Sequence, residues 1–197
     1  MPGPDDLAAS IRRARIVIDT NIDAFVRAAE SANAGAAYRP WGPTAPGHLT
    51  AMAWVVDQPS RHILLANHRL HGWSCPGGHL EADEHPLDGA TRELREETGI
   101  TAASASLDPL TIGYSVGCAR APGQAVGHWT LGYLYRISDR TELRAEADQP
   151  VAWFPLDRLP SPRAADIDLV VSYFLSRIKR GEDRLGSIGS IGSMPGY

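Results

Sequence analysis

One predicted helix constrains the fold of this chain more than any other segment. Apolar residues Leu87, Ala90 and Leu94 repeat at helical spacing, a proline precedes them, and Gly99 follows the last helical position. A proline in the first turn and a glycine just after the last turn are typical of helix ends. The pattern therefore predicts a helix over Pro86–Thr98 with one apolar side that packs against a core.

Three glutamates crowd the last two turns of this helix. Glu93 and Glu97 are four residues apart and share a face, and Glu96 lies beside Glu93. Such like-charge pairs cost a few tenths of a kcal/mol each, roughly, and the helix dipole disfavours anions at this end. An acidic, solvated face screened by Arg92 and Arg95 is one interpretation. The other is a cation that collects the carboxylates, for which Mg²⁺ or Mn²⁺ is suited.

Short apolar segments on both sides of this helix indicate a sheet. Strands are predicted at Leu49–Val56, His62–Asn67, Leu110–Val116, Trp129–Ile137 and Val151–Phe154, and a last amphipathic helix at Ile167–Ile178. Several strands with two or three helices in irregular order indicate an α/β or α+β fold. We therefore expect a mixed β-sheet with helices on its faces.

The two ends of the chain differ from this middle part. Apolar residues at helical spacing predict one amphipathic helix from Asp5 to Val26, and the proline- and glycine-rich stretch Tyr38–Gly47 predicts a loop. The Gly-Ser-Ile repeat at the end has no capacity to pack a core, so we expect disorder. The expected division is residues 1–46 (helix and loop), 47–180 (main domain) and 181–197 (disordered tail).

Composition limits the classes of function. The chain has 197 residues, of which 43% are hydrophobic, and a net charge of −4, which argues against duplex binding through bulk positive charge. Apolar runs such as Ala51–Val56 are too short to cross a bilayer, and the N-terminus lacks the features of a secretion signal. Two cysteines, Cys75 and Cys118, cannot build a disulfide framework. We expect a cytoplasmic protein that binds neither membranes nor nucleic-acid polymers.

The segment from Gly78 to Ile100 resembles the Nudix box, the signature of the Nudix hydrolase family. That pattern is Gly, five residues, Glu, seven residues, then Arg-Glu-apolar-any-Glu-Glu-any-Gly-apolar. Its defined positions are filled by Gly78, Glu84, Arg92, Glu93, Leu94, Glu96, Glu97, Gly99 and Ile100. Trp73–Glu81 is similar to the usual entry of the family into the box, and Val151–Pro160 to its usual exit from the sheet.

The resemblance implies a fold and a metal centre. The fold would be an α/β/α sandwich with a mixed sheet and the box on a loop–helix–loop. By position, the metal ligands of the family match Glu93, Glu96, Glu97 and the backbone carbonyl of Gly78. Glu84 matches a supporting carboxylate, and Arg92 matches the arginine that orients the acidic cluster.

The resemblance also implies a reaction. It is the Mg²⁺-dependent hydrolysis of a diphosphate linkage by a metal-activated water, in a nucleoside di- or triphosphate derivative or a related organic diphosphate. A carboxylate would complete the deprotonation of that water. Glu93 is one candidate base, and Glu146, on the loop before the late Trp-Phe strand, is our choice among Glu142, Glu146 and Asp148. An ordinary solvated glutamate is the alternative for Glu146.

A Nudix-fold module that senses a nucleotide without turnover is the competing hypothesis. A sensor has no need for three metal glutamates together with Arg92 and Glu84, so the complete set favours the enzyme. The substrate motifs of the reduced-dinucleotide, ADP-ribose and dinucleoside polyphosphate branches are absent; Ser115, for example, stands where a marker proline is expected. The N-terminal segment could pack on the sheet, close over the pocket or form a homodimer.

Several residues near the box keep two interpretations. Asp83 stands where many family members have glycine, which could reshape the loop beside the metal. A group of histidines near the box could hold a substrate phosphate or an additional metal, or be ordinary polar surface: His48, His68, His71, His79, His85 and His128. Among them His79, which falls inside the loop, and His128 are the preferred candidates. The thiol of Cys75 could act as a nucleophile, but we expect Cys75 to be a small buried residue that fills the core. Aromatic side chains could stack on a base or pack in the core: Trp73, Tyr114 and Trp129.

Overall fold

The computed structural model describes residues 4–33, 47–57, 61–69, 72–101, 103–116, 127–138, 140, 142–145 and 148–180. Four helices lie in these residues: α1 (Pro4–Ile11), α2 (Ile22–Asn33), α3 (Pro86–Thr98) and α4 (Ala165–Lys179). The strands are β1 (Ile16–Ile18), β2 (His48–Asp57), β3 (His62–His68), β4 (Gly72–Ser74), β5 (Gly77–His79), β6 (Ser104–Ala105), β7 (Thr111–Val116), β8 (Gly127–Ile137) and β9 (Val151–Pro155).

The strands form one mixed sheet, as expected. Its main path runs β1-β7-β8-β2-β3-β4, and β5, β6 and β9 pair with β2, β8 and β3. The long central strands β2 and β8 are parallel, from the pair His48–His128 to the pair Asp57–Ile137. β1 is parallel to β7, whereas β7 and β8 are antiparallel. This mixture of parallel and antiparallel pairs confirms the predicted sheet type.

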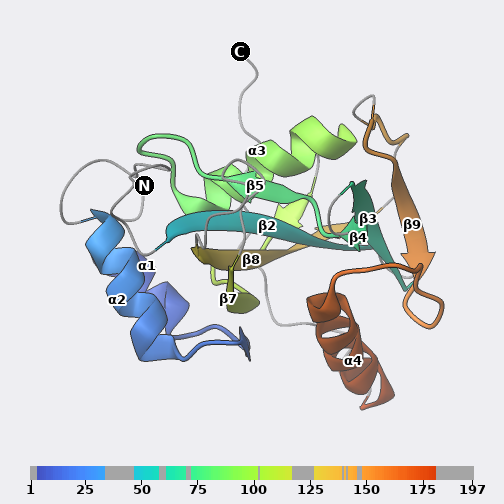
Figure 1. Ribbon diagram of the computed structural model, residues 1–197. Coiled ribbons are helices and arrows are strands. Elements are labelled where there is room, and N and C mark those ends of the chain that lie inside the picture. Colours follow the sequence, from blue (N-terminus) through green and yellow to red (C-terminus); the bar gives the residue numbers. More distant parts are fainter. Residues whose placement is uncertain are drawn as a thin grey trace.

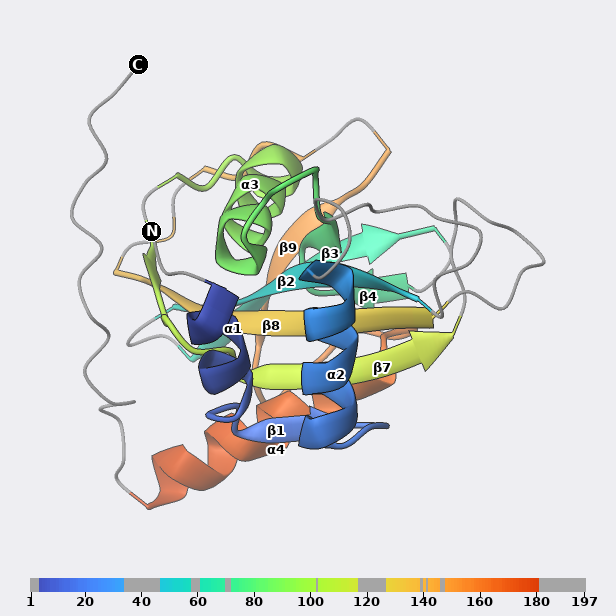
Figure 2. The same ribbon diagram turned by 90° about the vertical axis from the view of Figure 1, so that its left-hand side faces the viewer.

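Helices cover both faces of the sheet, which confirms the layered architecture (Figures 1 and 2). Alternate residues of β2 divide between the two cores: Leu49, Ala51, Ala53 and Val55 pack with α1, α2 and α3. Trp54 and Val56 pack with α4 on the opposite face. Successive side chains of a strand point to opposite faces, so a strand covered on both sides is apolar nearly throughout. This explains the continuous apolar run in the sequence.

The prediction of a single N-terminal helix is wrong. The chain leaves α1 after Ile11, pairs Ile16–Ile18 with β7 as an edge strand, and begins α2 at Ile22. β-Branched residues favour a strand once a sheet edge is available to pair with. Asn21 then caps α2, because its side-chain oxygen accepts a hydrogen bond from the backbone N–H of Ala24 at 2.9 Å.

The other predicted elements are confirmed with small shifts at their ends. Most of the predicted loop, residues 38–46, and the predicted tail, residues 181–197, lie outside the described residues. Among the described residues, no helix is both long enough and apolar enough to span a membrane.

The centre of the sheet contains a close contact that only glycine permits. The indole N–H of Trp54 donates to the hydroxyl of Thr111 at 2.9 Å in the buried interior. Gly132 lies beside this pair, and a Cβ atom built there would collide with both the hydroxyl and the indole. A Cβ atom at Gly113, on the adjacent strand, would meet Ile18 at an ordinary 3.4 Å.

We therefore expect Gly132→Ala to lower the free energy of unfolding by about 1–3 kcal/mol, the usual cost of overpacking a core. Gly113→Ala is the matched control and is expected to leave stability unchanged or slightly raised. Chemical denaturation followed by tryptophan fluorescence measures both variants. Equal midpoints for Gly132→Ala and the parent would refute the steric argument.

Candidate functional site

The helix α3 is fixed at both ends by its local sequence. The imidazole of His85 accepts a hydrogen bond from the N–H of Leu87 at 3.2 Å and thereby caps the first turn. Gly99 ends the helix with a left-handed φ of 75°, and its N–H donates to the carbonyl of Arg95 at 2.9 Å. The sequence predicts the role of Gly99 at the end of the helix. It does not predict the role of His85, because histidine is not among the residues preferred at the N-cap.

Two consecutive glycines bring β5 close to both the sheet and α3. A Cβ atom at Gly77 would lie 2.5 Å from the carbonyl oxygen of Ala51 on β2. A Cβ atom at Gly78 would lie 2.5 Å from Oε1 of Glu93 on α3. The carboxylate of Glu93 therefore occupies the space that a side chain at residue 78 would fill. The backbone of Gly78 and the Glu93 carboxylate meet, as their positions in the box predict.

Arg92 is the centre of an ionic network. Its guanidinium donates to both carboxylate oxygens of Glu84 at 2.8 and 2.9 Å, to Glu93 at 2.8 Å and to Glu96 at 3.0 Å. It also donates to the backbone carbonyl of His79 at 2.9 Å. Arg92 is only 16% exposed, so its charge-assisted bonds to Glu84 and Glu93 are partly shielded from water, whereas the bond to Glu96 is exposed.

The environment of each carboxylate is different. Burial raises the pKa of Glu93, and repulsion from Glu96 and Glu84 adds to this, while the bonds from Arg92 oppose it. Burial also acts to raise the pKa of Glu84, but the bonds from Arg92 outweigh it and the pKa falls below its ordinary value. Glu97 is 6% exposed, and its Oε2 accepts the N–H of Gly77 at 3.3 Å.

This donor set fits a hard divalent cation. Arg92 holds the carboxylates of Glu84, Glu93 and Glu96, of which Glu84 and Glu93 are largely buried and Glu96 is exposed, and the buried carboxylate of Glu97 lies on the same helix, bonded to Gly77. Buried anions need compensating positive charge, and one arginine supplies too little for four carboxylates. Carboxylate and carbonyl oxygens are the ligands that Mg²⁺ prefers.

A cavity of about 790 Å³ adjoins β5. Gly77, Gly78 and His79 line it on one side, and Asp166 of α4 lines it on another. Burial raises the pKa of Asp166. Asp166 carries no local sequence pattern that marks it as a candidate, because only the packing of α4 on the sheet brings its first turn to the cavity.

The N-terminal segment reaches the same cavity. Ile18 and Asp19, at the end of β1, belong to its lining, and Asp19 has a positive φ of 51° that turns the chain towards α2. This contact follows from the unpredicted pairing of β1 with β7. The segment before residue 46 thus contributes to the pocket wall.

Other candidate residues are placed as follows. Cys75 is buried in the core that contains α4, and burial raises the pKa of its thiol, which confirms the packing interpretation. Trp129 contacts the rings of Phe25 and Tyr114 at centroid distances of 5.5 and 4.6 Å. Trp73 contacts Phe154 at 4.7 Å. Trp129 and Trp73 pack against the two cores, which supports the packing interpretation for them, whereas Tyr114 lines the cavity and keeps both interpretations.

Two of the loop predictions have different outcomes. Asp83 adopts a positive φ of 61°, so the position keeps the left-handed conformation for which glycine is the default residue. The loop therefore keeps its turn, although the glycine is missing. Glu146 lies outside the described residues, and its assignment as a base stays a prediction. The neighbouring candidates Glu142 and Asp148 are exposed.

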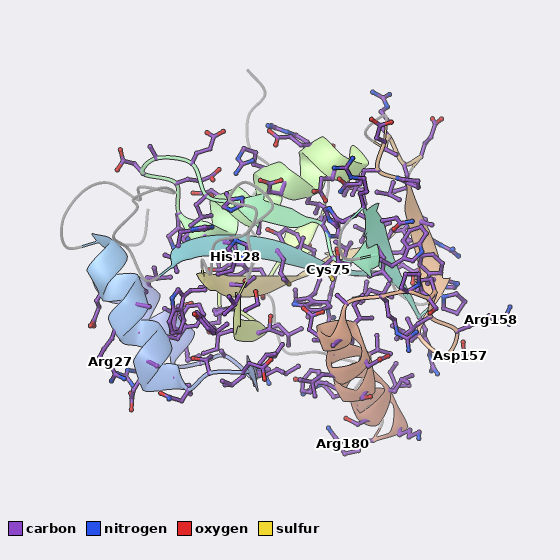
Figure 3. All side chains as sticks on the ribbon, in the orientation of Figure 1. Arg27, Cys75, His128, Asp157, Arg158 and Arg180 are labelled. Atoms are coloured by element: carbon purple, nitrogen blue, oxygen red, sulfur yellow. The ribbon has the colours of Figure 1, made fainter. Side chains whose placement is uncertain are left out.

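The structure selects three of the six histidines that the sequence offered as a cluster. One potential ligand atom from each of His48, His79 and His128 lies within 4.8 Å of the other two. His68 lines the cavity elsewhere, and His71 is outside the described residues. Figure 3 shows His128 at the sheet, whereas Arg27 of α2 and Arg180, just after α4, lie at the periphery of the view.

Comparison with known proteins agrees with the geometry. The family model described as the NUDIX domain matches residues 46–174. Phosphatase NudJ of Escherichia coli K12 is 63% identical over 58 residues, which is 28% of this chain and 37% of that protein, and NudJ of Shigella flexneri matches equally. The match thus spans little more than a third of the length of these relatives.

The solved structures support the fold. The crystal structure of a NUDIX-family hydrolase from Clostridium perfringens superposes with a TM-score of 0.53 at 18% identity, covering 66% of this chain and 97% of that one. The family match covers most of the sheet, all of α3 and the complete Arg92 network. On this evidence the chain belongs to the Nudix hydrolase family.

Proposed function

We propose that the protein hydrolyses a diphosphate linkage in a nucleoside di- or triphosphate derivative or a related organic diphosphate, in a reaction that requires Mg²⁺ or Mn²⁺. The observation that carries this proposal is the carboxylate cluster ordered by Arg92 beside a cavity large enough for a nucleotide. The name of the relative NudJ, a phosphatase, agrees with chemistry on phosphate groups.

The cation would be held by Glu93, Glu96 and Glu97 and by the backbone carbonyl of Gly78. When bound, such a cation lowers the pKa of a coordinated water and neutralises charge on phosphate oxygens. The proximity of the Glu93 carboxylate to Gly78 supports this ligand set. So does the burial of Glu97 beneath Gly77.

The residues of the chain itself have distinct roles in this proposal. Glu84 accepts two hydrogen bonds from Arg92 and thereby fixes the guanidinium. Arg92 in turn donates to Glu93 and Glu96 and holds both carboxylates in one orientation. Arg92 and Glu84 are therefore positioning residues. In the first of two alternatives for the general base, Glu93 accepts a proton from the attacking water, because burial raises its pKa above that of an exposed glutamate. Glu146 is the base in the second alternative.

The domain division belongs to the proposal as well. Residues 47–180 form the hydrolase domain in this view, and the family match over residues 46–174 supports its limits. Residues 1–46 are an addition, from which β1 extends the sheet and reaches the pocket. Residues 181–197 lie outside the described residues, and we do not expect the reaction to need them.

The reaction is tested with a panel of nucleoside triphosphates, nucleotide sugars, ADP-ribose, dinucleoside polyphosphates and prenyl diphosphates. Release of phosphate or of a nucleoside monophosphate is measured with Mg²⁺, with Mn²⁺ and with a chelator. Metal-dependent release from one class supports the proposal and names the substrate. Nucleotide binding without any release would instead support the sensing module.

Glu97→Gln is expected to lower metal-dependent turnover on the order of 100-fold, because one charged ligand of the cation is lost. Its stability should hold or rise, since glutamine keeps an acceptor for Gly77 and removes one charge from a repelling cluster. Glu30→Gln, on the exposed side of α2, is the control and should leave both properties unchanged. Full activity of Glu97→Gln would remove this residue from the proposed site.

Arg92→Ala is expected to lower the free energy of unfolding by about 3–5 kcal/mol, because it leaves buried carboxylates without their partner. Arg92→Lys keeps the positive charge but loses the planar set of N–H donors that binds several carboxylates at once. We therefore expect a smaller loss of stability than in Arg92→Ala, together with a reduced kcat. Arg12→Ala breaks the exposed pair with Asp23 and should change stability by less than about 1 kcal/mol. Denaturation and steady-state kinetics measure these effects; a fully active, fully stable Arg92→Lys would contradict the positioning role.

A further inference from the structure

We propose that His48, His79 and His128 form a second metal site, selective for Zn²⁺ or a similar transition metal and separate from the carboxylate cluster. One imidazole nitrogen from each residue lies within 4.8 Å of the other two. The ring centroids are 4.6 Å apart for His48–His79 and for His48–His128, and 5.3 Å apart for His79–His128. Each histidine thus touches both others.

The sheet itself brings the three residues together. His48 begins β2 and is the parallel register partner of His128 on β8. His79 ends β5, opposite Thr50, which is two residues beyond His48 on the same side of β2. Three adjacent strands therefore supply one ligand each. Ligands on paired strands are held more firmly than ligands on loops.

The donor atoms determine which metal is suitable. Neutral imidazole nitrogens suit Zn²⁺ and other transition metals, whereas Mg²⁺ prefers oxygen. With Zn–N distances of about 2.0–2.1 Å, tetrahedral ligands lie roughly 3.3 Å apart, so small side-chain rotations close the observed triangle. The Nε2 atoms of His48 and His128 are buried, and the limited access of solvent to these nitrogens favours retention of a bound metal.

The site has access to the cavity. His79 and His128 belong to the cavity lining, whereas His48 is 8% exposed and lies behind them. Three histidines leave a fourth coordination position for an oxygen ligand, which here would be a water or a phosphate oxygen. The backbone carbonyl of His79 accepts from Arg92, so a shift of this residue on metal binding would reach the carboxylate network.

Metal binding is tested directly on the full chain, with Mg²⁺ in excess to saturate the carboxylates. Metal-free protein is titrated with Co²⁺, whose visible spectrum reports nitrogen ligands, and with Zn²⁺ followed by dialysis and metal analysis. One equivalent bound by the parent is expected. His128→Gln and His79→Gln are expected to bind at least about 10-fold more weakly, and two variants are used in case one does not fold.

Two controls keep the outcome specific. His68→Ala removes a histidine from the same cavity but outside the trio, and Glu97→Gln weakens the carboxylate cluster; both should bind Zn²⁺ like the parent. Equal binding by the histidine variants, loss of binding in Glu97→Gln, or no Co²⁺ spectrum in the parent would each overturn the proposal. Hydrolysis of the substrate panel is a separate measurement, so the two proposals can fail independently.

Discussion

The guanidinium of Arg92 is the interaction on which the arrangement of the site depends. It joins a loop residue, Glu84, to two helix residues, Glu93 and Glu96, and to the backbone of β5 at His79. Without it, buried like charges would repel and the helix would lose its fixed distance from the loop. The four bonded groups come from three consecutive structural elements. One side chain thus sets the relative position of loop, strand and helix.

The close approach of β5 to β2 and to α3 places its backbone against the carboxylates of this network. Gly77 and Gly78 let the strand touch both β2 and the Glu93 carboxylate, and the N–H of Gly77 bonds the buried Glu97. A side chain at Gly77 would collide with β2, and one at Gly78 would collide with the Glu93 carboxylate of α3. Gly77 and Gly78 therefore belong both to the cavity wall and to the surroundings of the acidic cluster. Because they have no side chains, the strand can approach the carboxylates, and the hydrogen bond from Gly77 to Glu97 stabilises this approach.

Two chemically different donor sets lie on the two sides of this strand. The carboxylates of α3 offer hard oxygen ligands, and the histidines of β2, β5 and β8 offer imidazole nitrogens. Since these ligand types prefer different metals, neighbouring sites need not compete for one ion. The proposed hydrolysis depends on the first set only. The second set gives the pocket a means of sensing or holding another ligand.

The sequence by itself determined the local features: the helix Pro86–Thr98 with its ends, the glutamate spacing, the strand segments and the family signature. These depend on residues close together in the chain, whose spacing is visible in the sequence. Only the tertiary structure decided that residues 16–18 form an edge strand, that Asp166 reaches the cavity, and that His48 and His128 meet His79. Those contacts join segments up to about 150 residues apart, and they form only when distant strands pair and α4 packs on the sheet.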